Sequence, residues 1–393
     1  MTGEAWGMST GGAAIDLNQR LGSSAFAFRG YNQTNLGRTA ELLAVEAYRP
    51  TMQRRLHEAS ELCADTTGKP VDLLARVRRE EEAGLDAYGE AISLVFAAEF
   101  AQLDLLREFH GVDYGACRMA FGYSLGELIA AAASGVFPVD AVLRVPLTFA
   151  EDCAEMAEAC QMGIFFSRHS RLDEKLVLRL CEEVTAEDNG AVGVSAVLAP
   201  NTVLVIGQSD TLDRLKKRLN QAIDTPVLLR RHDGLWPPLH TPLVRRKNVP
   251  DRASVVIETI PRISETPRPQ ILSLVTGKPE YADDSGRETL RDWVDHPQRL
   301  WDVVCGVLSS DVRRIVHVGP CPNVIPATFR RLADNVAQQT LAWSLSGVGL
   351  RAVQRIANRP WLAALLPREG CLLRAPSVEH VILEDWLLEN APG

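Results

Sequence analysis

Residues 117–133 read Cys-Arg-Met-Ala-Phe-Gly-Tyr-Ser-Leu-Gly-Glu-Leu-Ile-Ala-Ala-Ala-Ala. The first five predict a short buried strand, and the last six predict the start of a helix rich in small residues. Gly122 and Gly126 flank Ser124, as a tight strand-to-helix turn requires where a Cβ would clash with its neighbours. Such a turn lifts the Ser124 hydroxyl above the sheet, at a helix N-terminus that favours developing negative charge. The stretch therefore indicates a serine nucleophile and acyl-transfer chemistry.

The composition is that of an ordinary globular chain. Of the 393 residues, 46% are hydrophobic and 23% are charged, which is enough to bury the cores of about two domains. The formal net charge of −8 argues against a general nucleic-acid binder, so we expect no nucleic-acid partner. No apolar run approaches the roughly 20 residues that cross a bilayer, and residues 1–20 do not have the pattern of a signal peptide. We therefore expect a cytoplasmic protein with no membrane partner.

The cysteines do not have the spacing of a metal site or of a redox motif. They lack C-x-x-C pairs and Cys/His ligand patterns, so we expect reduced, mostly buried thiols and no bound metal. The eight cysteines are Cys63, Cys117, Cys153, Cys160, Cys181, Cys305, Cys321 and Cys371.

Periodic patterns on both sides of the serine turn predict an α/β protein. Apolar residues recur at helical spacing over residues 90–109, and short apolar runs that resemble strands recur before and after the turn. Residues 162–229 follow a different order, strand-helix-strand-strand-helix-strand, which is typical of a ferredoxin-like unit. We therefore expect a parallel-sheet core of the α/β-hydrolase kind with an inserted ferredoxin-like (βαββαβ) subdomain.

These patterns divide the chain into parts. We expect a flexible N-terminal tail over residues 1–22 and a core formed by residues 23–160 and 231–334. The ferredoxin-like subdomain would occupy residues 161–230, and a C-terminal extension, residues 335–393, would dock on the core.

A serine nucleophile needs a base that takes its proton as it attacks. His240 is the first candidate, because prolines on both sides of it stiffen its loop and would fix the ring; His232 lies nearby. An alternative triad in the order serine, acid, histidine would combine Asp302 or Asp311 with His317. His317 lies inside an apolar, strand-like run, where a structural core histidine is the competing interpretation.

Together these motifs resemble the malonyl-CoA:acyl-carrier-protein transacylase family of fatty acid synthesis, which also occurs as the acyltransferase domains of polyketide synthases. The resemblance runs from about residue 24 to residue 331, and the ferredoxin-like unit falls where that family has one. Four landmarks occur in order: Phe28 with Gly30 and Gly37, the serine turn 122–127, Pro-Leu-His at 238–240, and Val-Gly-Pro at 318–320.

The resemblance implies a ping-pong acyl transfer. Ser124 would attack the thioester of an acyl-CoA with His240 as general base, and the phosphopantetheine thiol of an acyl carrier protein would then take the acyl group from the serine. The backbone N–H groups of Leu125 and Tyr31 would hold the oxyanion, and the Leu274 carbonyl would orient His240. Acyl-CoA and the carrier protein are thus the expected substrate and partner, and no cofactor is expected to stay bound.

Some positions depart from the family pattern. Tyr123 stands where the family has a histidine, and Thr148 stands where malonyl-specific members have the arginine that pairs with the malonate carboxylate. Arg144, one helical turn earlier, is the candidate substitute. Malonyl is the family's donor. Because of Thr148, three alternatives stay open: the donor is a neutral acyl group, the protein has a hydrolytic proofreading role, or it is a poorly active relative. A non-catalytic carrier-binding scaffold is a further alternative if Tyr123 blocks the serine.

Basic residues bracket His240 in an otherwise acidic chain. They are Arg230, Arg231 and the run Arg-Arg-Lys at 245–247. Their positive potential would bind the phosphates of CoA or an acidic carrier protein, and a solvated charged loop is the alternative interpretation.

Overall fold

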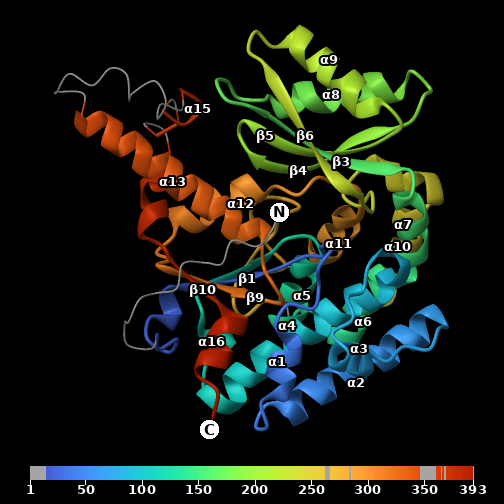
Figure 1. Cartoon of the computed structure of the whole chain (residues 1–393), viewed down its shortest axis with the longest axis vertical. Helices are drawn as coiled ribbons and strands as arrows, with labels where there is room; N and C mark the ends of the chain where they lie inside the picture. The colour runs from blue at the N-terminus through green and yellow to red at the C-terminus, as the bar shows by residue number, and fades with distance from the viewer. Residues whose placement is uncertain are drawn as a thin grey trace.

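Two sheets of different construction organise the molecule (Figure 1). The structure is a computed structural model that describes residues 15–261, 266–282, 285–345, 360–363, 365–366 and 369–392. The larger sheet has the strand order β10-β9-β1-β2-β7-β8, and the smaller sheet has the order β4-β5-β3-β6. The predicted fold class, a parallel α/β core with an inserted βαββαβ unit, is confirmed.

The larger sheet is parallel except at its edge strand β8, which runs antiparallel to β7. Phe26 and Phe28 of β1 pack on one face of this sheet, whereas Ala25 and Ala27 pack on the other. Both faces are buried because helices cover both, as is usual for parallel sheets. The strands are β1 (Ser24–Phe28), β2 (Met119–Gly122), β7 (Ile271–Leu272), β8 (Pro279–Glu280), β9 (Arg314–Val318) and β10 (Glu379–Ile382).

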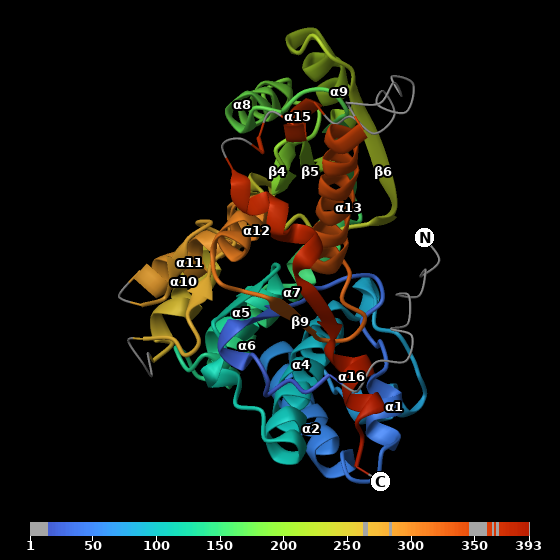
Figure 2. The ribbon, with the colours of Figure 1, turned by 90° about the vertical axis from the view of Figure 1, so that its left-hand side faces the viewer.

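Helices form a layer on each face of the sheet (Figures 1 and 2). The hydrophobic core on the side of Phe26 and Phe28 includes residues of α1 (Thr39–Ala44), α2 (Arg49–Thr67), α3 (Leu73–Arg78), α4 (Tyr88–His110), α5 (Leu125–Ala133), α6 (Val139–Thr148), α7 (Ala150–Ala157), α10 (Val249–Thr259), α11 (Ser285–Asp295) and α16 (Leu383–Glu389). The opposite face packs against α12 (Leu300–Ser309), α13 (Val324–Leu345), α15 (Pro360–Ala363) and η5 (Gly370–Ser377). Further 3₁₀ turns are η1 (Leu21–Ser23), η2 (Leu85–Ala87), η3 (Tyr114–Ala116) and η4 (Pro242–Lys247).

The smaller sheet is antiparallel and carries its own two helices on one face. Its elements are β3 (Cys160–Ser167), α8 (Glu174–Thr185), β4 (Val192–Ala199), β5 (Thr202–Gln208), α9 (Thr211–Ala222) and β6 (Val227–Leu235). Strand β6 continues five residues past the expected boundary at residue 230 and leads directly into the loop of His240. The end of β6 therefore sets the point from which the loop that carries His240 starts.

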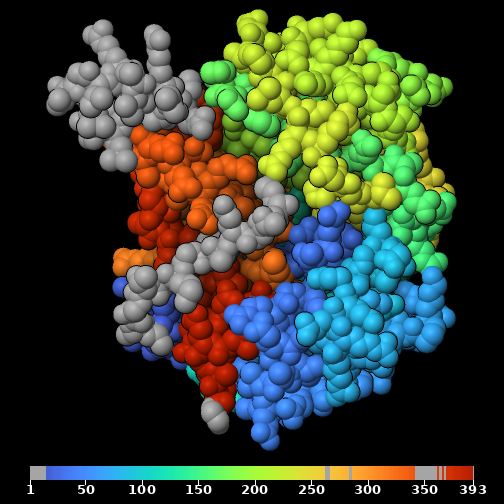
Figure 3. Space-filling model, viewed as in Figure 1, coloured from blue at the N-terminus to red at the C-terminus, as the bar shows by residue number. Residues whose placement is uncertain are grey.

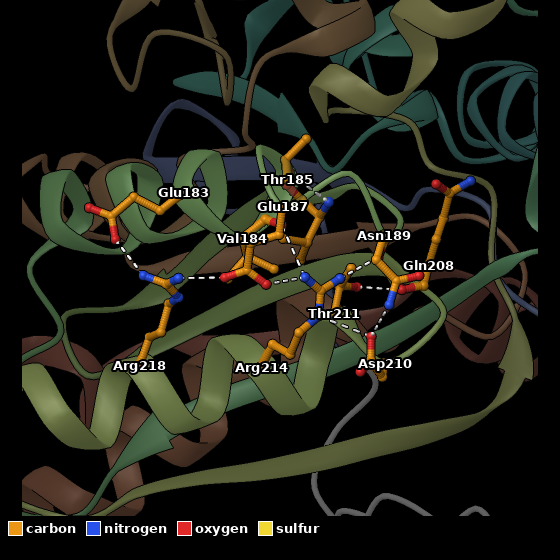
Figure 4. Close-up of polar contacts among 11 residues, drawn as sticks. Glu183, Val184, Thr185, Glu187, Asn189, Gln208, Asp210, Thr211, Arg214 and Arg218 are labelled. Atoms are coloured by element: carbon orange, nitrogen blue, oxygen red, sulfur yellow. Dashed lines mark hydrogen bonds and ion pairs between the residues drawn. The ribbon is translucent and has the colours of Figure 1, made fainter.

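Ion pairs join α8 to α9 on the outer side of the small sheet (Figure 4). Arg218 contacts both Glu183, at 2.9 Å, and Glu187. Arg214 contacts Glu187 as well, and lies 3.0 Å from Asp210. Because these side chains are partly exposed, the network contributes modestly to stability and mainly fixes the two helices side by side.

The two ends of the described chain lie together beside the core. Figure 3 shows the C-terminal segment against the N-terminal helices, and the Trp386 indole donates to the Ile15 carbonyl at 2.7 Å. Leu17 is buried, and Ile15 and Leu21 pack partly buried against the core, so apolar side chains anchor the described part of the expected tail, residues 15–22; residues 1–14 lie outside the described residues. The C-terminal extension supplies a strand of the main sheet, because β10 pairs in parallel with β9.

Among the helices of the described residues, none has both the length and the apolar character needed to cross a membrane.

The pairing of β10 with β9 predicts that the core depends on the C-terminal extension. Val381 of β10 is buried in the main core. Val381→Asp places an unpaired carboxylate there and should lower the free energy of unfolding in urea by about 3 kcal/mol or more. The matched control is Val255→Asp on α10, because Val255 is 69% exposed and the change should cost less than about 0.5 kcal/mol. Equal effects of the two variants would show that β10 is not part of the cooperative core.

Candidate active site

The serine turn joins β2 to α5 through tight backbone contacts. Ser124 has φ 54° and ψ −118°, a left-handed conformation that is rare for residues with a side chain. A Cβ on Gly122 would lie 2.1 Å from the Gly126 backbone, and a Cβ on Gly126 would lie 2.4 Å from the Phe28 carbonyl oxygen. Both glycines are therefore required, as the sequence predicted, and the half-buried Ser124 is the N-cap residue of α5.

His240 lies against this serine. Its Nε2 is 2.7 Å from Ser124 Oγ, although the two residues come from different parts of the fold. The His240 amide donates to the Val294 carbonyl at 2.9 Å, and the Ser195 hydroxyl of β4 donates to the Leu239 carbonyl at 3.2 Å. The histidine loop is thus fixed to α11 on one side and to the small sheet on the other.

A main-chain carbonyl orients the imidazole. His240 Nδ1 lies 2.6 Å from the carbonyl oxygen of Trp293. A carbonyl can only accept a hydrogen bond, so Nδ1 carries the proton and Nε2 is left to accept one from Ser124. The Trp293 indole also donates to the Ser124 carbonyl at 2.9 Å, and its ring packs edge-on against His240. Trp293 therefore holds both residues of the pair.

The expectation that Leu274 orients His240 is wrong. The Leu274 carbonyl accepts from the Arg299 amide at 2.6 Å. The Leu274 amide donates to the buried carboxylate of Glu127 at 2.9 Å, and burial raises the pKa of Glu127 to about 7. Glu127 thus holds the 273–277 turn beneath α5, while the end of α11 occupies the place beside His240.

Gln298 is a site residue that the sequence analysis missed. Its Oε1 accepts from the Ser124 amide at 3.0 Å, and its Nε2 lies 3.4 Å from His240 Nδ1. Its main chain pairs with β4, because its carbonyl accepts from Val197 and its amide donates to Ser195, both at 2.8 Å. One fully buried residue therefore connects the small sheet to the serine turn.

The two expected oxyanion donors are the N–H groups of Leu125, which follows Ser124, and of Tyr31, which follows Gly30. Leu125 is the first residue of α5, so its N–H has no acceptor within the helix. Next to Tyr31, a Cβ on Gly30 would lie only 3.2 Å from Ser124 Cβ, which places the loop that begins at residue 29 against the serine. The Tyr31 ring packs edge-on against Tyr88, with 4.8 Å between ring centroids. The structure thus brings these groups together, and their role stays a prediction.

Tyr123 does not hydrogen-bond to Ser124 or His240 among the described residues. Its half-buried ring joins apolar side chains beneath the small sheet, including Leu198 and Trp236, and burial raises the pKa of its hydroxyl.

Arg144 does not serve the site as expected. It pairs with Asp65 of α2 at 2.8 Å and lines a groove between α2, α4 and α6, because its face of α6 packs toward α2. The Thr148 hydroxyl donates to the Arg144 carbonyl at 2.8 Å, and the Thr148 carbonyl accepts from Arg252 at 2.8 Å. Among the described residues, no arginine or lysine hydrogen-bonds to the Thr148 hydroxyl.

The alternative bases do not face Ser124. His317 is buried on β9, and its Nε2 lies 2.9 Å from His380 Nδ1 of β10. Asp302 pairs with Arg299 at 2.7 Å, so the triad through His317 is not assembled. His232 Nδ1 accepts from a backbone amide two residues away, at 3.1 Å.

The basic residues around His240 divide into two groups. One group pairs with carboxylates of the same chain: Arg231 with Asp213 at 2.6 Å, Arg245 with Asp295 at 2.7 Å, and Lys247 with Glu155 at 2.8 Å. In the second group, Arg246 donates to Gln208 Oε1 at 2.7 Å, and Arg230 lines a cavity between the small sheet and α12, α13 and α15.

This cavity is strongly basic and measures about 400 Å³. Arg168, Arg230 and Arg331 line it, and no acidic residue does so among the described residues. Leu198 forms part of its wall and packs on the same apolar cluster as Tyr123. Through Leu198 the cavity wall thus shares an apolar cluster with Tyr123, while Ser124 and His240 do not line the cavity.

Burial controls the protonation of the candidate base. It lowers the pKa of His240 from its ordinary value to about 4, although the Trp293 carbonyl and the charge of Asp295 act in the opposite direction. His240 is consequently neutral at neutral pH and able to accept the Ser124 proton. Within the described residues, no cluster of three His, Cys, Asp or Glu side chains is arranged to hold a metal ion.

Comparison with known proteins agrees with this fold. No protein-family model matches the sequence. A phenolphthiocerol/phthiocerol polyketide synthase component of Mycobacterium tuberculosis is 25% identical over 324 residues, which are 80% of this chain and 19% of that protein. The corresponding protein of Mycobacterium bovis matches to the same extent. The chain thus spans about a fifth of the length of the curated relatives it matches.

Solved structures share the architecture. FabD from Acinetobacter baumannii superposes with a TM-score of 0.63 at 18% identity, over 79% of this chain and 91% of that one. The malonyl-CoA:acyl carrier protein transacylase of Xanthomonas oryzae gives a TM-score of 0.63 at 21% identity, over the same shares. A malonyl-transacylase in complex with the acyl carrier protein of a type II polyketide synthase gives 0.60 at 22% identity, over 78% and 92%. The resemblance noted in the sequence is confirmed at the level of the fold.

The low pKa of His240 predicts how the reactivity of Ser124 depends on pH. The rate constant for labelling of Ser124 by a fluorophosphonate should be flat from about pH 8 to about pH 5, because the base stays neutral. It should decline only as the pH falls toward about 4. Ser124→Ala is the control for site-specific labelling. A midpoint near the ordinary histidine value, about 6.5, would contradict the buried, neutral base.

Proposed function

We propose that this chain, which has the fold of the malonyl-CoA:acyl carrier protein transacylases, is an acyltransferase that moves an acyl group from coenzyme A to the phosphopantetheine thiol of a carrier protein. The observation that carries the proposal is the 2.7 Å contact between Ser124 Oγ and His240 Nε2. The serine lies on a strand-to-helix turn, and the Trp293 carbonyl holds the imidazole in the tautomer whose Nε2 can accept the serine proton. This arrangement suits nucleophilic acyl chemistry.

In the first half-reaction, Ser124 Oγ forms a bond to the thioester carbonyl carbon while His240 Nε2 takes the hydroxyl proton. The N–H groups of Leu125 and Tyr31 stabilise the negative charge on the carbonyl oxygen. The carbon–sulfur bond then breaks, and CoA leaves as a thiol with the proton from His240. The products are acyl-Ser124 and a neutral His240.

The second half-reaction runs the same steps with a different thiol. His240 accepts the proton of the phosphopantetheine thiol as the sulfur attacks the ester carbon of acyl-Ser124. The carbon–oxygen bond to Ser124 breaks, and His240 returns the proton to the serine. The acyl group leaves on the carrier, and the enzyme is ready for another donor.

The basic cavity is the proposed entry for the phosphate-bearing arm. Arg168, Arg230 and Arg331 suit a phosphate group, because guanidinium groups bind phosphate oxygens in a fork. Both thiol substrates carry a phosphate at the far end of the same pantetheine arm, so one cavity serves both half-reactions. The Xanthomonas oryzae protein is by its name a transacylase between malonyl-CoA and acyl carrier protein, which supports coenzyme A and a carrier protein as the two thiol substrates of this proposal.

The acyl donor proposed here is uncharged. The resemblance places Thr148 where a cation would bind a malonyl carboxylate, and the nearby arginines have carboxylate partners, Arg144 with Asp65 and Arg252 with Asp152. A carboxylate bound near Thr148 would lose water without gaining a paired charge, which is costly.

A labelling experiment tests the transfer. Radiolabelled acetyl-CoA should label the enzyme, and added holo acyl carrier protein should take up the label. His240→Ala should slow enzyme labelling by about 10²-fold or more, whereas the matched change His232→Ala should have little effect. Ser124→Ala should abolish labelling. Release of free acid with no label on the carrier would support hydrolysis instead, and unchanged labelling of Ser124→Ala would refute the nucleophile.

A second experiment tests the charge of the donor. Acetyl-CoA should acylate Ser124 at least about tenfold faster than malonyl-CoA, because the malonyl carboxylate lacks a cation. Thr148→Arg should reverse part of this preference by providing a bidentate partner. Thr259→Arg, at an exposed threonine of α10, is the matched control and should leave the ratio unchanged. A wild-type preference for malonyl-CoA would overturn the proposed donor class.

A further inference from the structure

Arg29 is a buried arginine at the start of the loop that carries Tyr31. It is 4% exposed, and its guanidinium lacks a carboxylate partner within salt-bridge distance among the described residues. It donates instead to oxygens of the loop and of the segment after β9: Gly30 O at 2.8 Å, Thr34 O at 3.2 Å, Asn35 Oδ1 at 3.0 Å, and Pro320 O. A buried charge used in this way fixes the path of a main chain.

The hydrogen bond from Arg29 to the Gly30 carbonyl fixes the peptide group between Gly30 and Tyr31. The carbonyl of Gly30 and the N–H of Tyr31 belong to the same planar trans unit and point in opposite directions. Because Arg29 Nε holds the Gly30 carbonyl, the Tyr31 N–H is directed away from Arg29. Gly30 itself lies against the serine turn, where a Cβ would meet the Tyr123 carbonyl oxygen at 2.5 Å.

The side chains of Asn35 and Glu82 hold the remainder of the loop. Asn35 is fully buried, and its Oδ1 accepts from the Asn32 amide at 3.0 Å as well as from Arg29. The amides of Asn35 and Leu36 donate to the Glu82 carboxylate, at 2.7 Å and 3.2 Å. The loop is thus closed by side chains at both ends, with Arg29 at the end next to the serine.

The Arg29 side chain is itself confined. Its amide donates to Glu99 Oε1 of α4 at 2.9 Å. A Cβ on Gly319 would lie 2.6 Å from Arg29 Cγ and 2.3 Å from Glu99 Oε1, so the absence of a side chain at residue 319 leaves room for the arginine. The segment after β9 therefore contributes to the serine site through Arg29.

We infer that Arg29 is a positioning residue, which sets the Gly30–Tyr31 peptide so that the Tyr31 N–H completes the oxyanion site with Leu125. This inference rests on the acyl-serine chemistry proposed above. Arg29 acts through the main chain and does not touch the substrate. Lysine cannot replace it, because one ammonium group cannot reach four oxygens in the planar arrangement of a guanidinium.

The test measures phosphorylation of Ser124 by a fluorophosphonate. In this reaction Ser124 Oγ forms a bond to phosphorus, fluoride leaves, and His240 takes the proton, while charge develops on the phosphoryl oxygen at the oxyanion site. Arg29→Lys should lower the maximal rate constant by about 10²-fold with little change in the concentration of probe that gives half-maximal rate. Guanidinium ion at about 20 mM should restore the rate of Arg29→Ala at least several-fold, and methylammonium ion should not.

Arg314 supplies the matched control. It is 5% exposed on β9, donates to the carbonyls of Asp16 and Gln19, and pairs with Glu379 at 2.7 Å, so Arg314→Lys should affect the melting temperature but not the rate constant. A rate constant for Arg29→Lys within about twofold of wild type, at equal folded fraction, would overturn the inference. So would guanidinium that raises the melting temperature of Arg29→Ala without raising its rate. Failure of wild-type enzyme to accept acyl groups from CoA would refute the proposed transfer. It would leave the inference about Arg29 intact, because the fluorophosphonate readout does not require CoA.

Discussion

Close approach of three backbone segments at the ends of β1 and β2 is the constraint on which the site depends. A Cβ atom on Gly30, Gly122 or Gly126 would in each case lie within 2.5 Å of a neighbouring main-chain atom, well inside van der Waals contact. The left-handed Ser124 can be held only because these segments pack on one another without side chains. The nucleophile, the helix N-terminus and the Tyr31 loop therefore form one rigid unit.

The small subdomain is coupled to that unit through Gln298. Its main chain extends the edge of β4, and its side chain accepts from the Ser124 amide. Ser195 of the same strand holds the loop of His240. A displacement of the small sheet would consequently alter both the serine and its base, so the position of the small subdomain and the geometry of the pair are set together.

Side-chain patterns in the sequence predicted much of this arrangement. Glycine spacing identified the serine turn, and hydrophobic periodicity identified the βαββαβ unit, because both depend on local sterics. The partner of His240 Nδ1 could not be found in that way: the acceptor is the main-chain carbonyl of Trp293, and any residue provides a carbonyl. Helical spacing alone places Arg144 on the face of Thr148, but it does not show that α2 packs there and that Asp65 pairs with Arg144. Strand β10 escaped notice because its pairing with β9 joins segments far apart in sequence.

A weak base suits the proposed exchange of thioesters. Burial that lowers the pKa of His240 to about 4 makes it a weak base toward any hydroxyl, that of Ser124 included, although it stays neutral and able to accept a proton. A thioester, however, is an activated acyl group with a good leaving group, and a thiol, whose pKa in cysteine is about 8.5, releases its proton more readily than a serine hydroxyl does. Transfer of the acyl group back to sulfur therefore needs a weaker base at His240 than attack by water would. The same burial that weakens the base also keeps it neutral, so that it is ready to accept a proton in both half-reactions.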